Sequence, residues 1–285
     1  MSRLLYLVHR LPYPPNKGDK VRSFHLLKHL ARRHEVHLGT FVDDPEDEQY
    51  LDTVRGYCAG LHVERISPRT AKLRSLSGFL AGEALSLPYY RSAGMQAWVR
   101  QTLARQHFDA AVAFSSVMAQ YVPQGLPVLV DFVDADSAKW AAYADSRAWP
   151  MSWVYRREGR RLLDFERRTA MRARRGFFVT PAEVALFTDL APECAPKVEA
   201  IGNGVDADFF APAHAGVSPY GADEIPLVFT GAMDYWPNVD AVCWFVAEVL
   251  PALLRQWPTL RFHIVGRSPA PAVQALAAAE GSVAV

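Results

Sequence analysis

The most constraining feature of this sequence is a stretch near its C-terminal end that alternates between strand and helix patterns. An apolar run over Leu227–Thr230 predicts a buried strand, and residues 231–237 form a loop. Residues 239–255 then carry apolar side chains at helical spacing, with Asn238 at the N-cap position. A second apolar strand is predicted over Leu260–Val265. A strand, a helix and a strand in this order predict a parallel α/β unit.

The residues before this unit predict an α/β domain of their own. Apolar runs alternate there with helical patterns, and we expect strands at 4–9, 35–41, 61–66, 109–114, 128–132 and 176–179. The first helix is expected over 20–33, with Val21, Phe24, Leu27 and Leu30 on one face. This alternation predicts a doubly wound sheet, in which ligands bind beyond the C-terminal ends of the strands.

Two domains follow from these patterns. Residues 1–215 are expected to form a first Rossmann-like domain, and residues 225–285 the beginning of a second. The linker is placed at Pro212–Pro226, a segment rich in Ala, Gly, Pro and Ser.

Composition restricts the class of partner and the compartment. Lys and Arg number 31 and Asp and Glu 30, so the formal net charge of +1 gives no argument for a nucleic-acid partner. No apolar run approaches the roughly 18 residues of a membrane span, and the N-terminal apolar stretch is too short for a secretion signal. Cys58, Cys194 and Cys243 have no metal-ligand spacing, and scattered cysteines of odd number fit a reducing cytoplasm.

The loop Pro14–Lys20 is the first candidate for chemistry. It follows the first strand and ends at a helix N-terminus, where unpaired backbone N–H groups and the helix dipole favour an anion. Gly18 would allow a phosphate to approach the backbone, and Lys17, Lys20 and Arg22 would add positive charge. The loop is neither a Walker loop nor a dinucleotide fingerprint. The alternative is a surface turn with ordinary solvated lysines.

A second candidate is a group of acids at the end of the strand predicted over 128–132. Asp131, Asp134 and Asp136 follow one another at i, i+3 and i+5, and in a strand Asp134 and Asp136 would share a face. Clustered carboxylates at such a position can bind a metal, act as bases or hold sugar hydroxyls. The alternative is that Asp136 or Ser137 caps the next helix, and both interpretations can hold together.

Two further segments are open to more than one interpretation. Asn203-Gly204 predicts a tight turn with positive φ, and whether it also faces a ligand is open. The segment 155–177 is rich in arginine and has apolar residues on one side. It predicts a helix with a solvated charged face, or one that contacts anionic lipid headgroups or an anionic acceptor.

Taken together, these segments resemble family-4 glycosyltransferases. The resemblance rests on the second-domain opening at 229–251 and 264–269, the stretch Asn203-Gly204-Val205-Asp206 with Phe209, and the first-domain opening at 12–36. The segment 131–140 resembles a subgroup found with exopolysaccharide and exosortase loci.

The resemblance implies the glycosyltransferase-B fold, with two Rossmann-like domains facing across a cleft. It implies sugar transfer from a nucleotide-sugar co-substrate to a glycan or lipid-linked acceptor, with retention at the anomeric carbon, no essential metal and no other cofactor. The protein would be cytoplasmic, with peripheral contact at the inner membrane. The resemblance implies that the loops at Gly18 and Gly231 approach the donor. The candidate substrate- and donor-binding residues are Lys17, Gly18, Asp19, Arg22, Asn203, Gly204, Gly231 and Asn238, and the candidate catalytic residues are Asp134 and Asp136.

The sequence also departs from the family pattern. Many members carry an Arg and a Lys after the glycine that matches Gly231, where this chain has residues 233–236 Met-Asp-Tyr-Trp. Many carry a histidine where this chain has Val133 and Asp134. The family's second domain continues well beyond residue 285, so we expect a truncated chain that transfers no sugar by itself. The alternatives are a non-catalytic acceptor-binding module and a fragment of a nucleotide-sugar epimerase.

Overall fold

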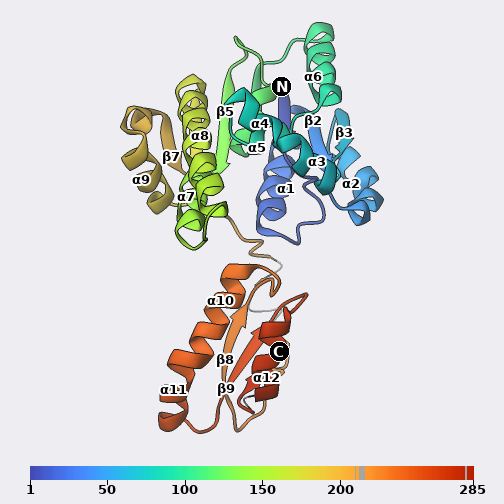
Figure 1. The fold of residues 1–285 in the computed structure, drawn as a ribbon. Helices are drawn as coiled ribbons and strands as arrows, with labels where there is room; N and C mark the ends of the chain where they lie inside the picture. The colour runs from blue at the N-terminus through green and yellow to red at the C-terminus, as the bar shows by residue number, and fades with distance from the viewer. Residues whose placement is uncertain (209, 212–215, 280) are drawn as a thin grey trace. The chain divides into compact units, whose positions relative to one another are not determined.

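The chain forms two compact units. The computed structural model describes residues 1–208, 210–211, 216–279 and 281–285. Unit 1 comprises Met1–Val205 and unit 2 Asp206–Val285, coloured from blue to gold and from orange to red in Figure 1. Residues 212–215 of the predicted linker, and Phe209 of the motif that begins at Asn203, lie outside the described residues.

Unit 1 is built on a seven-stranded sheet in the order β3-β2-β1-β4-β5-β6-β7, in which all neighbouring strands are parallel. The strands are β1 (Arg3–Val8), β2 (Glu35–Val42), β3 (Gly60–Arg65), β4 (Ala110–Phe114), β5 (Val128–Val133), β6 (Arg175–Phe178) and β7 (Val198–Ala200). The six predicted strands are confirmed with small shifts of their ends. The short β7 was not predicted, because Val198–Ala200 is too short to show a pattern.

Helices connect these strands and cover the sheet (Figure 1). They are α1 (Gly18–Ala31), α2 (Leu51–Arg55), α3 (Pro68–Ser75), α4 (Ser77–Ala81), α5 (Ser86–Tyr89), α6 (Ala93–Arg105), α7 (Asp136–Asp145), α8 (Met151–Arg172) and α9 (Pro181–Leu190). Short 3-10 helices lie at Pro45–Tyr50, Ser116–Tyr121 and Pro192–Lys197. Local capping fixes some starts: the side chain of Thr180 accepts a hydrogen bond from Glu183 N at the start of α9.

The core of unit 1 lies on both faces of its sheet. In β1, Leu5 and Leu7 pack into one apolar cluster, while Tyr6 and Val8 pack into the other. Successive side chains of a strand point to opposite faces, so this division means that both faces of β1 are covered. The continuous apolar run that predicted β1 is therefore the signature of a central strand.

Unit 2 has a smaller sheet with the order β10-β9-β8, again parallel. Its elements are β8 (Ile225–Thr230), α10 (Trp236–Trp244), a π-helical segment (Phe245–Val249), α11 (Leu250–Gln256), β9 (Leu260–Val265), α12 (Pro271–Ala279) and β10 (Val283–Ala284). The predicted β-loop-α-β unit is thus present. Two details differ: β8 is largely exposed rather than buried, and its helix begins at Trp236 rather than after Asn238.

The helical stretch Trp236–Gln256 has the length and composition of a membrane span, with 21 residues and a mean hydropathy of 1.4. The sequence expectation that no segment approaches such a span was wrong here, because two acidic residues interrupt the run without making the helix polar. Val242, Val246 and Leu250 are buried in the core of unit 2. A helix that covers a sheet with one face meets the same test; these three contacts are those of such a helix, and 17% of its apolar window is buried.

Candidate functional site

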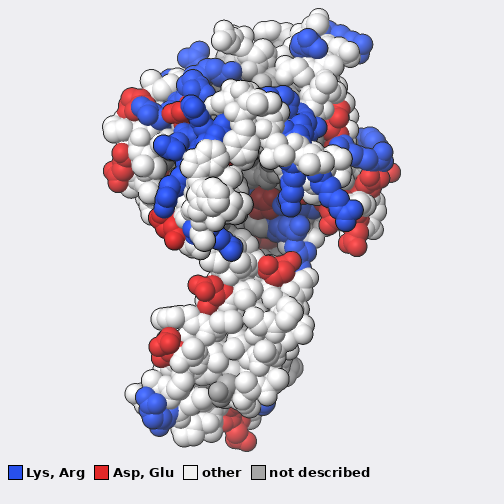
Figure 2. Space-filling model, viewed as in Figure 1, with Lys and Arg blue, Asp and Glu red and all other residues white. Residues whose placement is uncertain are grey.

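The strand order places the switch point of unit 1 beside β1. β2 and β3 lie on one side of β1, and β4 to β7 lie on the other. In open α/β sheets, ligands bind outside the carboxyl ends of the strands where this order reverses. Figure 2 shows a hollow in unit 1 between the positions of α7 and α1, with acidic and basic atoms inside it. The segments after β1 and β5 carry most of the predicted site residues.

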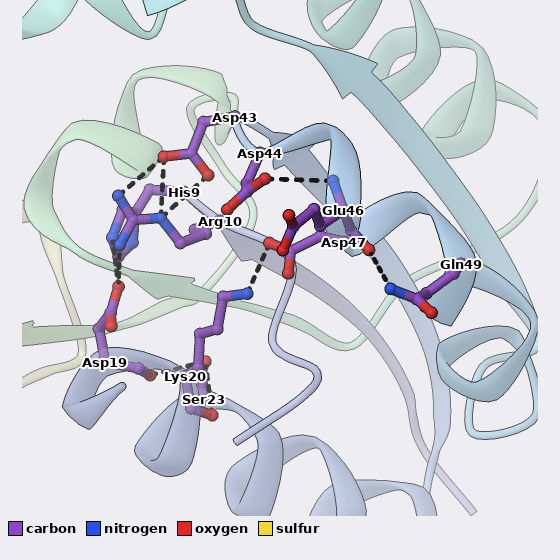
Figure 3. A network of polar contacts seen from close by, with 10 residues as sticks. All are labelled: His9, Arg10, Asp19, Lys20, Ser23, Asp43, Asp44, Glu46, Asp47 and Gln49. Carbon is purple, nitrogen blue, oxygen red and sulfur yellow. Dashed lines mark hydrogen bonds and ion pairs between the residues drawn. The ribbon is translucent and has the colours of Figure 1, made fainter. Parts of the chain in front are cut away.

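A charged network lies at the carboxyl end of β1 (Figure 3). Arg10 Nη2 donates to Asp43 Oδ2 at 2.8 Å, and Arg10 Nη1 donates to Asp19 Oδ2 at 3.0 Å. His9 Nε2 lies 3.4 Å from the same oxygen of Asp19. The network therefore ties the end of β1 to the end of β2 and to the first turn of α1.

Asp19 stays ionised in this network, and His9 keeps one nitrogen free. Burial raises the pKa of Asp19, but the hydrogen bond from His9 and the charges of His9 and Arg10 outweigh it and hold the pKa well below its ordinary value. His9 Nδ1 is buried and finds no hydrogen-bond partner among the described residues. The bond to the Asp19 carboxylate holds the ring of His9 in one orientation.

The predicted anion loop leads directly into α1. The helix starts at Gly18, and its N-cap residue Lys17 makes no side-chain capping bond. A Cβ atom at Gly18 would meet no heavy atom within 4 Å. The space beside Gly18 at the start of α1 is therefore open to a ligand, while the Lys20 N–H is already bonded to the Asp19 carboxylate.

Two of the predicted cations beside this loop are already paired. Lys20 Nζ lies 2.5 Å from Asp47 Oδ2, with side-chain exposures of 2% and 7%. Arg22 Nε lies 2.8 Å from Asp131 Oδ2. Buried charges require such partners, because water no longer solvates them. The structure thus corrects the expectation that all three cations are free. Of the three, Lys17 alone has no ion pair with a described residue.

Arg22 also reaches the segment that follows β7. Its Nη1 donates to Ile201 O at 2.9 Å and to Asn203 Oδ1 at 3.0 Å. Gly204 is exposed, and its φ lies outside the left-handed region. The turn with positive φ predicted for Asn203-Gly204 is therefore not formed, and the side chain of Asn203 instead accepts a hydrogen bond from Arg22.

Asp134 and Asp136 are brought together by a lysine and not by a shared strand face. β5 ends before Asp134, and Asp136 is the first residue of α7. Lys139 Nζ lies 2.5 Å from Asp134 Oδ2 and 3.5 Å from Asp136 Oδ1. The N-cap residue of α7 is Ala135, without a side-chain cap, so the prediction that Asp136 or Ser137 caps this helix was wrong.

The electrostatics of this acidic group extend into the core. Burial raises the pKa of Asp136, the charges of Lys139 and His9 lower it, and the net shift is upward. Glu166 on α8 is fully buried, and burial, together with the charge of Asp136, raises its pKa to about 8. The site in unit 1 thus contains carboxyl groups with opposite shifts of pKa, since that of Asp19 is lowered.

The predicted residues of unit 2 meet at the end of β8. Asn238 lies in the first turn of α10, and its Nδ2 donates to Ala232 O at 3.0 Å. It is therefore not the N-cap residue that the sequence predicted; Tyr235 has that position. A Cβ atom at Gly231 would lie 2.7 Å from Asn238 Nδ2, and one at Gly266 only 1.7 Å from Gly231 O. Glycine is needed here because the segments after β8 and β9 approach closely.

Three residues at the switch point were missed by sequence reasoning: His9, Arg10 and Asp43. The available signal was their position, since His9 and Arg10 directly follow β1 and Asp43 directly follows β2. The carboxyl ends of parallel strands meet at one edge of a sheet, so polar residues at those ends are neighbours. No group of His, Cys, Asp or Glu that could hold a metal ion occurs among the described residues.

Comparison with known proteins identifies the fold. No protein-family model and no curated protein matches the sequence. The trehalose-6-phosphate phosphatase N-terminal domain from Candida albicans is 13% identical, with a TM-score of 0.60 over 100% of this chain and 72% of that chain. An α,α-trehalose-phosphate synthase (UDP-forming) from Burkholderia vietnamiensis is 15% identical, with a TM-score of 0.53 over 97% of this chain and 67% of that chain.

A third similar structure was solved with a nucleotide. The MnaA–UDP co-structure from S. aureus is 12% identical, with a TM-score of 0.51 over 100% of this chain and 69% of that chain. At these identities the likeness shows the fold and not the activity. The chain has the α/β fold of the glycosyltransferase-B type, with Rossmann-like domains, as the sequence predicted.

Proposed function

We propose that this protein is a glycosyltransferase, or part of one, that transfers a sugar from a nucleotide-sugar donor to a glycan or lipid-linked acceptor. The observation that carries the proposal is the open N-terminus of α1 beside the His9–Asp19 pair, at the switch point of a glycosyltransferase-B sheet. The comparisons support this class of substrate, since one similar protein is a UDP-forming synthase and another was solved with UDP. Within this class we propose a retaining family-4 enzyme of exopolysaccharide biosynthesis.

The residues of unit 1 take complementary roles in this proposal. Departure of a nucleoside diphosphate develops negative charge, which the N–H groups at Gly18 and the ammonium group of Lys17 would stabilise. Asp134 and Asp136 would accept hydrogen bonds from sugar hydroxyls, with Lys139 holding both carboxylates in place. Asp19, Arg22 and Asn203 would act by positioning, because their side chains are engaged within the protein.

For unit 2, taken by itself, we propose that the loop after β8 is a donor-binding segment. Gly231 leaves room for close approach of the backbone, and Asn238 fixes the loop through its bond to Ala232 O. The nucleotide-sugar is a co-substrate, and the proposed mechanism uses no other cofactor. The proposed location is cytoplasmic, at the inner membrane, where lipid-linked acceptors are found. Arg160 and Arg161 on α8 are exposed and would make this contact, although Arg161 Nη1 also lies 3.8 Å from Asp164 Oδ2.

The experiment is a calorimetric titration of the 285-residue chain with UDP, GDP and dTDP. We expect one of these diphosphates to bind, and Gly18→Trp to abolish binding by filling the space in front of α1. Gly56→Trp, at another exposed glycine of unit 1, is the matched control and should bind normally. If no diphosphate binds, or if Gly18→Trp binds as well as the parent, the proposed site is wrong.

A product assay separates transfer from the alternatives. The chain is incubated with the nucleotide-sugar that binds, with and without a lipid-linked acceptor extract. A labelled acceptor that forms only when the extract is present shows transfer, and it would contradict the expectation that this chain transfers no sugar by itself. An epimerised nucleotide-sugar formed without acceptor would instead identify an epimerase, and binding of acceptor without any diphosphate would identify a non-catalytic module.

A further inference from the structure

Unit 1 has an apolar stripe that faces solvent instead of the core. α3 and α4 form an almost continuous helical stretch, because the residue between them, Leu76, has helical φ and ψ. Leu73, Leu76 and Leu80 recur at spacings of three and four residues and are exposed by 70%, 52% and 95%. This spacing places side chains on one face of a helix. The stretch is therefore amphipathic with its apolar side turned outward.

A second exposed apolar group lies at the start of α8, with Trp149 just before the helix and Trp153 in its first turn. Trp149 and Trp153 are four residues apart and are exposed by 81% and 50%. Trp153 stacks on Phe79 of α4, with ring centroids 5.9 Å apart and an interplanar angle of 4°. This contact joins α4 to the start of α8, and we call the exposed residues Leu73, Leu76, Leu80, Trp149 and Trp153 of these two segments the Leu–Trp surface.

Arg157 of α8 links the two segments of this surface through hydrogen bonds to the backbone around α4. Its guanidinium group donates to Gly78 O at 2.8 Å and to Glu83 O at 3.0 Å. The same group lies over the ring of Phe79, 4.7 Å from the centroid. Glu158 accepts hydrogen bonds from the N–H groups of Leu85 and Ser86 at the start of α5. The outward orientation of the stripe is thus fixed by polar contacts behind it.

The flanks of the Leu–Trp surface are basic. Residues 66–82 and 146–157 contain no Asp or Glu, and they include exposed basic residues at positions 69, 72, 147 and 156. Of these, Arg156 forms an ion pair with Asp145, an exposed acid just before residue 146. Its Nη2 lies 3.4 Å from Asp145 Oδ1. Figure 2 shows uncharged atoms on the near side of unit 1 between groups of Lys and Arg atoms.

We propose that the Leu–Trp surface inserts into the headgroup region of an anionic lipid bilayer. Exposed leucines and tryptophans flanked by Arg and Lys are the combination that an interfacial site requires, because apolar side chains enter the acyl boundary while cations meet anionic headgroups. An anionic surface matches the charge of both flanks. The inference deepens the proposed function by naming the surface that would bring unit 1 to a lipid-linked acceptor.

The Leu–Trp surface differs from the arginine-rich segment 155–177, for which the sequence left a lipid contact as one of its alternatives. Arg157 serves internal contacts, so replacing it would disturb α4 as well as the charge. The apolar residues provide a cleaner test, because Leu80 and Trp149 are among the most exposed large apolar residues. Charged substitutions there leave the folded core unchanged.

The test is co-sedimentation of the whole chain with vesicles in the absence of any nucleotide. We expect binding to phosphatidylcholine vesicles that contain phosphatidylglycerol, and weaker binding as ionic strength rises. Leu80→Glu and Trp149→Glu should each lower the partition coefficient by on the order of tenfold. Leu190→Glu, at an exposed leucine of α9, is the matched control and should bind like the parent.

Three outcomes would overturn the inference. They are absence of parent binding, equal binding to vesicles of phosphatidylcholine alone, and unchanged binding of both glutamate variants. Light scattering gives a further check. If the parent chain is a dimer and Leu80→Glu makes it monomeric, the surface binds a second copy of the chain and not a bilayer. Because no nucleotide is present, the vesicle experiment does not depend on diphosphate binding. Failure of the titration and failure of vesicle binding can therefore be told apart.

Discussion

Strands β1 and β8 are alike in sequence and different in burial, and the contrast separates pattern from environment. Both are six-residue strands with a mostly apolar sequence. Five residues of β1 are buried, whereas none of β8 is fully buried. β1 pairs with β2 and β4, while β8 lies at the end of its sheet order and contains Pro226, which lacks a donor. An apolar run thus predicts a strand, and its neighbours decide whether water reaches it.

The largest expected effect of this contrast is on hydrogen exchange. The Leu5 amide lies in the fully covered β1, and its exchange requires unfolding of unit 1. The Phe229 amide lies in β8, where local opening is sufficient. We expect protection to differ by about a thousandfold or more, on the order of 4 kcal/mol. Equal protection of the two amides in native-state exchange would remove the distinction between the strands.

Side-chain truncation sharpens the same comparison. Leu7 is fully buried in β1 and Leu227 is half-buried in β8. Leu7→Ala leaves a cavity and should lower the free energy of unfolding of unit 1 by about 3 kcal/mol. Leu227→Ala exposes less apolar area and should cost about 1 kcal/mol. Chemical denaturation followed by circular dichroism measures both, and similar losses would contradict the assignment of β8 as an exposed strand.

The covered sheet of unit 1 also buries a carboxyl group with a measurable pH signature. Burial raises the pKa of Glu166 from an ordinary value of 4.5 to about 8. Between these values the folded protein keeps the proton and the unfolded chain has released it, so stability falls as pH rises through this window. Glu166→Gln removes this effect. It should stabilise the protein by at most about 5 kcal/mol above the window and give little gain below it.

Urea unfolding at several pH values checks this expectation. Glu199→Gln on β7 is the control, because that carboxyl is exposed. The control should follow the parent at every pH. A Glu166→Gln curve parallel to that of the parent would show that the buried carboxyl has an ordinary pKa.

The smallest expected effect concerns two glycines of the predicted site. Gly204 in unit 1 has open space around it and no left-handed φ, so Gly204→Ala should change stability by less than about 0.5 kcal/mol. Gly231 in unit 2 contacts the Asn238 amide, so Gly231→Ala should cost about 1 kcal/mol by displacing that hydrogen bond. Thermal unfolding compares them, and a larger loss at Gly204 would restore the tight turn that the sequence predicted.

The sequence predicted the fold better than the contacts within the candidate site. Strands such as β1 and β4 were placed to within one residue, because their apolar runs depend on local pattern alone. The cation expected at Lys20 was misplaced for a different reason. Its partner Asp47 lies 27 positions away, and nothing near Lys20 in the chain indicates that the pair is buried.

What the sequence determined by itself is the alternation of strand and helix, the position of the loop before Gly18, and the class of fold. These depend on spacing of apolar residues, on helix ends and on chain order. The tertiary structure alone decided which charges are free: it paired Arg22 with Asp131 and left His9 Nδ1 without a partner among the described residues. The reason is that burial and electrostatics depend on distances in space, and residues 109 positions apart meet only when the sheet has formed.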